Sequence, residues 1–404
     1  MTTRTVVIGA YNVAAFPEGG GHFWVYLQYV LGLRQLGCDV YWLEGFRTTG
    51  RADREAAALA KFRERMQQYG LSRKHIIYVT RSKEPSLETP TEYLDMPRSE
   101  AEAVFERADL LLNFHYAISP ALLARFRRTA LVDIDPGLLQ FWITRGQLVV
   151  PRHDVYFTIG ENVGRPGGRI PDCGLNWIPI RPPVSLDYWP YRYDPRCEAF
   201  TTVSIWDSSD WIVDGSEQYE NTKRVAFLEY ADLPRLTSQP LELALFLKGK
   251  RDMAERKDME RLGWRIRRSR EVAATPEMYQ RYIQRSRGEF SCVKRSCIEF
   301  QNAWVSDRTA CYLASGKPVV VQNTGPSEFL PNGEGMFRFA TPEEAARAFD
   351  QINADYEHHC KAARKLAEAH FDAKKTAAKI LSHALGHDEP ERNGREALTG
   401  ARVL

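Results

Sequence analysis

The sequence lacks the features of a membrane protein, of a secreted disulfide-bonded protein and of a metal-binding protein. It has no run of about 18 apolar residues, so we expect no segment that spans a bilayer. It opens directly on a strand-like segment and lacks the apolar core of a signal peptide. Its seven cysteines form no Cys-x-x-Cys pair and no Cys/His spacing typical of zinc sites. We therefore expect reduced thiols, a cytoplasmic protein and no bound metal.

An excess of one charge is also lacking. The chain has 55 Lys and Arg against 52 Asp and Glu, a net charge of +3. Charge at the scale of the whole chain thus gives no argument for nucleic acid or for a membrane surface, and we expect no nucleic-acid partner. The 404 residues, with 44% hydrophobic and 26% charged side chains, are ordinary for a globular protein and sufficient for two domains.

Two consecutive series of alternating strands and helices are present. The pattern predicts an α/β fold with two Rossmann-like domains, residues 1–180 and 198–385, joined by a Pro-rich linker at 181–197. The polar stretch 386–404 is typical of a disordered tail.

Two segments of the second domain carry specific expectations. Residues 217–229 are expected to contain the helix that follows the first strand of this domain. Residues 354–385 have a helical pattern throughout, so we place a terminal helix in the second domain.

The segment 306–324 carries the clearest local signal. Ser306 can cap a helix through its hydroxyl, and Asp307 suits the positive helix end. Gly316 and Pro318 end that helix, and the β-branched run 319–321 predicts a strand buried on both faces. The first amides of the helix would point above the sheet, where they form an anion site.

This segment resembles the donor-binding element of GT-B glycosyltransferases, in its Ala-Ser-Gly-Lys-Pro-Val-Val sequence and the Gln-Asn-Thr-Gly-Pro turn that follows. The resemblance implies two Rossmann-like domains facing a cleft. The second domain would bind a nucleoside-diphosphate sugar, with the diphosphate at the helix start, and the first would bind the acceptor. Many members hold the ribose with a glutamate on this helix, whereas this chain has Cys311 there.

Several residues of the second domain are candidates for the donor site. Lys223 stands where retaining members often place a lysine against the donor phosphates, and Lys248 and Lys294 follow neighbouring strands. Trp304 could stack on the base or close the core, with the core favoured. We expect Asp307 to cap the helix and to point away from a diphosphate. The predicted donor-binding residues are Lys223, Lys248, Lys294, Trp304, Ser306, Asp307, Arg308 and Thr309.

A glycine loop ending at His22 is the main feature of the first domain. Many inverting GT-B enzymes have a histidine at a comparable place, where it removes the proton of the acceptor hydroxyl, a task that suits neutral imidazole. The competing interpretation is a histidine that only packs at the helix start. Strand ends bring further polar residues to the same edge of the sheet. We assign acceptor binding to Gly20, Gly21, His115 and Glu161.

Asp133 and Asp135 are further catalytic candidates, because either could orient His22. Their Asp-x-Asp spacing also resembles that of the metal-dependent GT-A enzymes. The second αβ series argues against that class, and we expect these residues to cap a turn or line the acceptor site.

Two other classes of function stay open. A nicotinamide-dependent oxidoreductase is disfavoured, because the first glycine loop is not Gly-x-Gly-x-x-Gly and Glu44 is a weak match to the ribose-binding acid. A sugar-nucleotide-binding protein without catalysis is the other. We predict a metal-independent glycosyltransferase with a nucleoside-diphosphate sugar as donor, no tightly bound cofactor and a small-molecule acceptor such as a natural-product intermediate. The sequence leaves its oligomeric state open.

Overall fold

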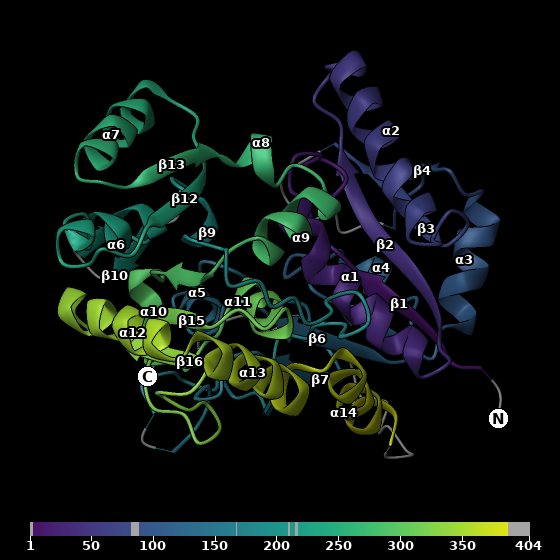
Figure 1. Cartoon of the computed structure of the whole chain (residues 1–404). Helices are drawn as coiled ribbons and strands as arrows, with labels where there is room; N and C mark the ends of the chain where they lie inside the picture. The colour runs from purple at the N-terminus through teal and green to yellow at the C-terminus, as the bar shows by residue number, and fades with distance from the viewer. Residues whose placement is uncertain (1–2, 82–88, 167, 209–210, 215–216, 387–404) are drawn as a thin grey trace. The chain divides into compact units, whose positions relative to one another are not determined.

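The computed structural model describes residues 3–81, 89–166, 168–208, 211–214 and 217–386 (Figure 1). The chain divides into two compact units. Unit 1 comprises Met1–Arg181 and Ala373–Leu404, and unit 2 comprises Pro182–Asp372.

Unit 1 is built on an eight-stranded sheet with the strand order β4-β3-β2-β1-β5-β6-β7-β8. Its strands are β1 (Thr5–Gly9), β2 (Asp39–Arg47), β3 (His75–Thr80), β4 (Tyr93–Leu94), β5 (Leu110–Asn113), β6 (Thr129–Asp133), β7 (Val155–Thr158) and β8 (Trp177–Pro179). All neighbours pair in parallel except β3 and β4. The register pairs Gly9 with Asn113 and Asp133 with Thr158, so these strands end at one edge of the sheet.

The helices of unit 1 include the one that ends the described chain. They are α1 (Gly20–Gln35), α2 (Ala52–Gln68), α3 (Arg98–Arg107), α4 (Pro120–Leu123), α5 (Leu138–Thr144) and α14 (Ala373–Leu385). Helix α14 packs on α1 so closely that a β-carbon on Gly32 would lie 2.3 Å from the carbonyl oxygen of Ala373. We had placed this terminal helix in the second domain, and the structure assigns it to unit 1 (Figure 1).

Unit 2 is built on a six-stranded parallel sheet with the order β13-β12-β9-β14-β15-β16. Its strands are β9 (Phe200–Ile205), β12 (Leu241–Phe246), β13 (Arg265–Arg268), β14 (Gly288–Ser291), β15 (Val319–Gln322) and β16 (Met336–Phe339), and a hairpin joins β10 (Trp211–Asp214) to β11 (Glu217–Glu220). Every residue of β15 is buried, as its β-branched run predicts.

The helices of unit 2 lie between and after these strands in the chain. They are α6 (Lys223–Glu229), η1 (Leu233–Arg235), α7 (Lys250–Arg261), α8 (Ser269–Val272), α9 (Pro276–Gln284), α10 (Arg295–Glu299), α11 (Asp307–Ala314), α12 (Pro342–Ala354), α13 (Tyr356–Leu366) and the π-helical turn η2 (Ala367–Phe371).

The predicted fold class is confirmed, because each unit has a mainly parallel sheet with intervening helices. The helix expected within residues 217–229 is α6, which begins after strand β11. Two details differ. The helical pattern of residues 354–385 is interrupted at Asp372, which has φ −56° and ψ 121°. Arg181 of the expected linker belongs to unit 1, and residues 182–197 belong to unit 2, where Val184 and Trp189 are fully buried. The predicted tail lies, beyond Gly386, outside the described residues.

Candidate functional site

The start of α11 combines a side-chain cap with free backbone donors. Ser306 Oγ accepts a hydrogen bond from the Arg308 amide at 3.2 Å, and the Ala310 amide makes the first helical bond, to the Ser306 carbonyl. The amides of Asp307 and Thr309 have no hydrogen-bond partner among the residues that the structure describes. Two backbone donors at the positive end of the helix dipole can therefore receive an anion.

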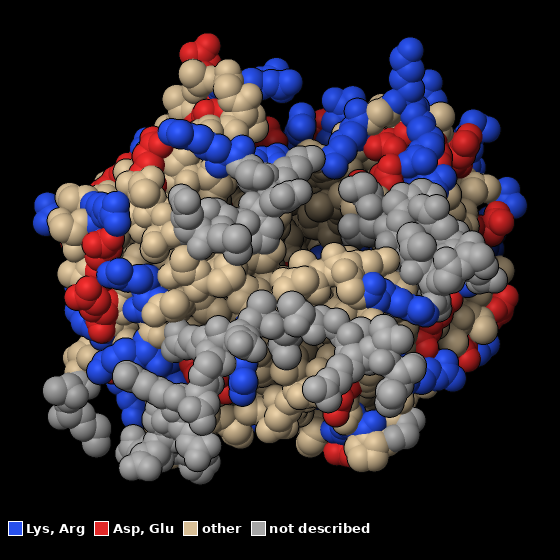
Figure 2. Space-filling model, turned by 180° about the vertical axis from the view of Figure 1, so that it is seen from behind, with Lys and Arg blue, Asp and Glu red and all other residues tan. Residues whose placement is uncertain are grey.

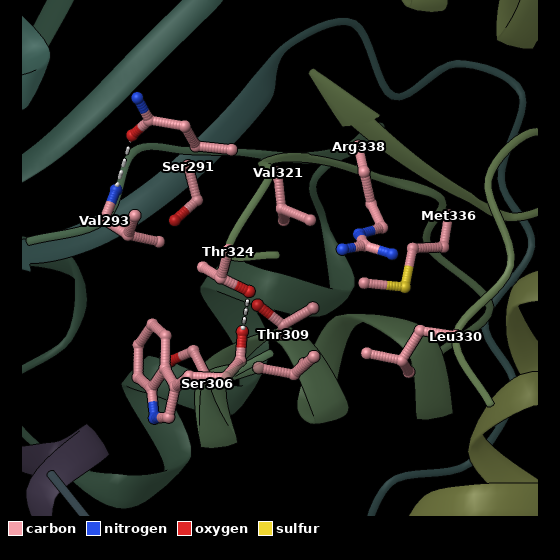
Figure 3. Close-up of a pocket in the computed structure, with 12 residues that line it drawn as sticks. Ser291, Val293, Ser306, Thr309, Val321, Thr324, Leu330, Met336 and Arg338 are labelled. Atoms are coloured by element: carbon pink, nitrogen blue, oxygen red, sulfur yellow. Dashed lines mark hydrogen bonds between the residues drawn. The ribbon is translucent and has the colours of Figure 1, made fainter. Parts of the chain in front are cut away.

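A pocket opens beside this helix start (Figure 3). It holds about 320 Å³, part of it open to solvent. Side chains from β14, β15 and β16 lie opposite those of Ser306 and Thr309. The lining residues are Ser291, Val293, Trp304, Val305, Ser306, Thr309, Val321, Gln322, Thr324, Leu330, Met336 and Arg338.

The wall of the pocket is fixed by short-range hydrogen bonds and by one glycine. Thr324 Oγ1 donates to the carbonyl oxygen of Trp304 at 2.9 Å, and the Ala303 amide donates to the Thr324 carbonyl at 2.9 Å. Gly325 has φ +110°, and a β-carbon there would lie 2.7 Å from Cβ and 2.8 Å from Cα of Gln301. The Gln-Asn-Thr-Gly-Pro turn therefore needs its glycine for both conformation and space.

A group of charged side chains gathers at the same helix end. Lys223 Nζ lies 5.7 Å from the centroid of the Trp304 ring, within range of a cation–π contact. Burial, and then the positive charges of Arg308 and Lys294, lower the pKa of Lys223 to about 7, although Asp307 acts in the opposite direction. The structure thus brings Lys223, Lys294, Trp304 and Asp307 together, and an anion bound there would relieve the repulsion between the cations.

Arg308 differs from our expectation, because its amide, a predicted donor to the diphosphate, is bonded to Ser306, and its side chain is not among those that line the pocket. Its guanidinium donates to Glu289 Oε1 at 2.7 Å, to the carbonyl oxygen of Val203 at 2.9 Å and to Ser291 Oγ at 2.5 Å. Burial opposes its charge, but the carboxylate of Glu289 more than offsets this and raises the pKa of Arg308. Because the Arg308 amide is bonded to Ser306, this residue anchors α11 to the sheet.

Lys248, a predicted donor-binding residue, and Cys311, at the position of the ribose-binding glutamate, are not among the residues that line the pocket. Lys248 is exposed, with its Nζ 5.5 Å from the centroid of the Phe246 ring. Cys311 is 2% exposed and packs within α11, so its side chain cannot replace the ribose-binding glutamate.

Asp133 is fully buried and accepts four hydrogen bonds, one of which is the turn cap that we expected and none of which comes from His22. Its Oδ1 accepts from the Tyr116 hydroxyl at 3.3 Å and from the Asp135 amide at 2.9 Å, and its Oδ2 accepts from Gln140 and Thr158, both at 2.9 Å. Burial raises the pKa of Asp133 to about 6 despite these bonds. The carboxylate therefore braces the strand ends of unit 1.

Glu161 has a structural role as well. It is 2% exposed and forms ion pairs with Arg181 and, at 3.5 Å, with Arg165. Its carboxylate is therefore used inside unit 1, where the sequence had suggested an acceptor contact.

His22 and His115 lie near each other around Tyr11. His22 Nε2 is 2.9 Å from the Tyr11 carbonyl oxygen, and the rings of Tyr11 and His115 stack with their centroids 4.7 Å apart. A carbonyl oxygen only accepts, so this hydrogen bond requires a proton on Nε2 of His22. Burial lowers the pKa of His115 to about 4, which keeps this ring neutral.

Asp135 is electrostatically coupled to the same group. Burial, followed by the charges of Glu44 and Asp135, raises the pKa of Tyr26, whose ring lies 5.4 Å from that of His22. Gly20 and Gly21 form the first turn of α1 directly before His22.

Glu44 is the residue whose role sequence reasoning missed. Its carboxylate accepts from the amides of Val13 and Ala14 at 2.6 and 2.8 Å and from the Trp42 indole at 3.1 Å. The acid that a dinucleotide ribose would need is thus buried and bonded to the chain itself. No local motif predicts this role, because the two amides that Glu44 binds are about thirty residues away in sequence.

Similarity to known proteins is detected in structure and not in sequence. No family model matches the chain, and no curated protein sequence matches it. HepE of Anabaena, in complex with UDP and glucose, aligns with a TM-score of 0.56 and 10% identity over 96% of this chain and 100% of its own. The sucrose-phosphate synthase of Thermosynechococcus elongatus aligns with a TM-score of 0.52 and 14% identity over 94% and 97%.

An α-glucosyltransferase in complex with UDP and DNA aligns with a TM-score of 0.57 and 11% identity over 95% of this chain and 100% of its own. Glycosyltransferases thus recur among the similar structures, at nearly full coverage of both chains. The chain has the GT-B fold.

The DNA-bound member of this GT-B group corrects one expectation. We had excluded a nucleic-acid partner from the small net charge, yet an α-glucosyltransferase of the same fold is in complex with DNA. Charge summed over a whole chain cannot exclude such a partner, because local charges decide binding. On the face shown in Figure 2, Lys and Arg side chains lie among Asp and Glu side chains.

Searches of the described residues for other sites return two negative findings. No described helix has both the length and the apolar composition needed to cross a membrane. No group of three or more His, Cys, Asp or Glu side chains in the described part of the chain could hold a metal ion.

Proposed function

We propose that the chain is a glycosyltransferase that takes a sugar from a nucleoside-diphosphate sugar bound in unit 2. One observation carries the proposal. Trp304, Ser306 and Thr309 line one pocket at the start of α11, where the amides of Asp307 and Thr309 are unbonded among the described residues, and Lys223 Nζ lies 5.7 Å from the centroid of the Trp304 ring. Amides and a lysine together offer the charge-assisted bonds that a diphosphate needs.

UDP-glucose is the first donor to test. HepE and the α-glucosyltransferase, which share the fold, are both in complexes that contain UDP. In our assignment the diphosphate accepts bonds from the amides of Asp307 and Thr309 and from Lys223, while Trp304 lies against the nucleotide. The donor then needs no divalent ion for its phosphate charge, and we propose that transfer is metal-independent.

The acceptor would bind in unit 1, with His22 as the general base of an inverting transfer. Nδ1 of His22 would remove the proton of the attacking hydroxyl, since Nε2 already donates to Tyr11. A small-molecule acceptor stays a prediction. Acceptor screens should therefore include hydroxyl compounds of several classes, nucleic acid among them.

The two alternative functions can be separated from this one. A nicotinamide enzyme is not favoured, because Glu44 is bonded to Val13, Ala14 and Trp42 and cannot receive a ribose. A binding protein without catalysis would bind the donor but would neither hydrolyse nor transfer its sugar.

A binding panel tests the proposal directly. The melting temperature is measured with UDP-glucose, other nucleotide sugars, NAD and NADP, and then binding and donor turnover are measured in Lys223→Ala. Lys257→Ala, in the exposed part of α7, is the matched control. We expect a nucleotide sugar to raise the melting temperature. Of the two variants, only Lys223→Ala should bind the nucleotide sugar more weakly than the wild type does. Stabilisation by NAD or NADP only, or equal binding by both variants, would refute the proposal.

A further inference from the structure

Two buried ionisable side chains hold the loop between β1 and α1, residues 10–19: Arg65 as a cation, and Glu44, whose pKa burial raises to about 7, as a carboxylate above that pH. From one side, Glu44, which is 1% exposed, accepts from the amides of Val13 and Ala14 with one oxygen and from the Trp42 indole with the other. All three donors belong to unit 1, and two of them are in the loop. The middle of the loop is thus tied to strand β2 by a carboxylate.

From the other side, Arg65 of α2 reaches the end of the same loop. Its side chain is 7% exposed, donates to the carbonyl oxygen of Pro17 and lies 5.9 Å from the centroid of the Phe23 ring. An anion therefore binds the amides at residues 13–14, and a cation binds a carbonyl at residue 17.

The loop in turn fixes the ring of His22. The Tyr11 carbonyl oxygen accepts from His22 Nε2 at 2.9 Å and from the Tyr26 hydroxyl at 3.3 Å. Asn12 follows with φ +57°, a left-handed conformation that asparagine adopts more readily than most residues. This turn lets the Tyr11 carbonyl face α1 while the next two amides, of Val13 and Ala14, face Glu44.

A loop of this length does not need two buried charges to be stable. Burying an ion costs free energy even when hydrogen bonds satisfy it, and neutral groups could hold the same backbone. What charged groups add is directional strength, because a bond to an ionised partner, such as Arg65 or Glu44 above pH 7, is roughly twice as strong as a neutral one. The free-energy cost of burying these two groups is consistent with a loop whose position matters for function.

We propose that Glu44 and Arg65 are positioning residues that act through Tyr11 on His22. They hold the loop so that the Tyr11 carbonyl always accepts from Nε2, which leaves Nδ1 of His22 as the basic nitrogen. The inference deepens the proposed function and rests on it for the catalytic consequence. The tautomer of His22 itself does not depend on that function.

The experiment measures both consequences in the full chain. Nitrogen NMR spectra of ¹⁵N-histidine-labelled protein report which ring nitrogen carries the proton, and His22→Gln identifies the His22 signals. Glu44→Gln puts an amide NH₂ where a carboxylate accepted three bonds, so a donor must face a donor. Arg65→Met removes the bond to Pro17 while keeping an unbranched side chain, and it serves if Glu44→Gln does not fold. Glu106→Gln, an exposed carboxylate of α3, is the control for charge.

We expect the wild type and Glu106→Gln to show His22 protonated at Nε2 alone. Glu44→Gln and Arg65→Met should show a mixture of tautomers and a kcat lowered about 10–100-fold, with unchanged Kd for UDP-glucose. A single Nε2 tautomer in both variants would overturn the inference, whatever happens to kcat. An unchanged kcat with mixed tautomers would overturn its catalytic part. A wild type that binds but never turns over the donor would contradict the proposed function, and the spectra would still decide the tautomer.

Discussion

The starts of helices α11 and α1 each belong to one of the two αβ units, yet they are built in different ways. Helix α11 is capped by the side chain of Ser306, the residue next to it in sequence. Helix α1 begins after Gly19, which has no side chain to cap it, and the loop before it is held by Glu44 and Arg65 from other elements. One site is thus organised by local chemistry and the other by long-range contacts.

The largest effect should come from the acceptor side. His22→Ala should lower kcat by about 10²–10⁴-fold, because a general base contributes that much, while the Kd for UDP-glucose stays unchanged. Steady-state kinetics and calorimetry on the same preparation check both quantities. A product that retains the anomeric configuration, or a near-normal kcat, would contradict the role of His22.

Stability as a function of pH should distinguish the buried carboxylate of Glu44 from surface acids. Burial raises the pKa of Glu44 from 4.5 to about 7, so the folded state holds its proton more tightly than the unfolded chain does. The free energy of unfolding should therefore decrease as the pH rises from 4.5 through 7 and then level off, by about 3 kcal/mol. In Glu44→Gln this contribution should vanish. Urea titrations at several pH values measure it, and parallel pH curves for the two proteins would refute the assignment.

On the donor side, Lys223→Ala should weaken UDP-glucose binding by about 1.5–3 kcal/mol, the loss of one charge-assisted bond. Because burial lowers the pKa of Lys223 to about 7, wild-type affinity should decrease as the pH rises above 7, where the free lysine loses its charge. Lys223→Ala should lack this pH dependence. Calorimetric titrations between pH 6 and 9 provide the test, which fails if both proteins give the same slope.

The smallest effect should come from the pocket wall. Gly325→Ala forces a β-carbon into a position with φ +110° and 2.7 Å from Gln301, so we expect a loss of about 1–2 kcal/mol in stability and weaker donor binding. Gly333→Ala is a useful control, because φ is also positive there and a β-carbon would meet nothing within 4 Å. Equal losses in both variants would show that conformation alone matters and that contact with Gln301 does not.

The same contrast explains how far the sequence could be interpreted. The strand pattern and the Ser306 cap are local signals, and both are present in the structure as expected. Arg308 could not be assigned, because its partner Glu289 is 19 residues away and only the sheet brings them together. Asp133 caps the turn at Asp135 as expected, but its partners Tyr116 and Thr158 could not be predicted, because they come from other strand ends.

The terminal helix shows that a local sequence pattern does not predict which unit a helix joins. The pattern of residues 354–385 predicts helix throughout, but no local signal tells that its last part, α14, joins the sheet of unit 1. The contact with Gly32 of α1 decides this, and it links positions more than three hundred residues apart.

A crystal structure with UDP-glucose or UDP bound would test the central claim most directly. The account predicts the diphosphate at the start of α11, with its oxygens within hydrogen-bond distance of the amides of Asp307 and Thr309 and of Lys223 Nζ. A diphosphate bound anywhere else in unit 2, or at the glycine loop of unit 1, would contradict it.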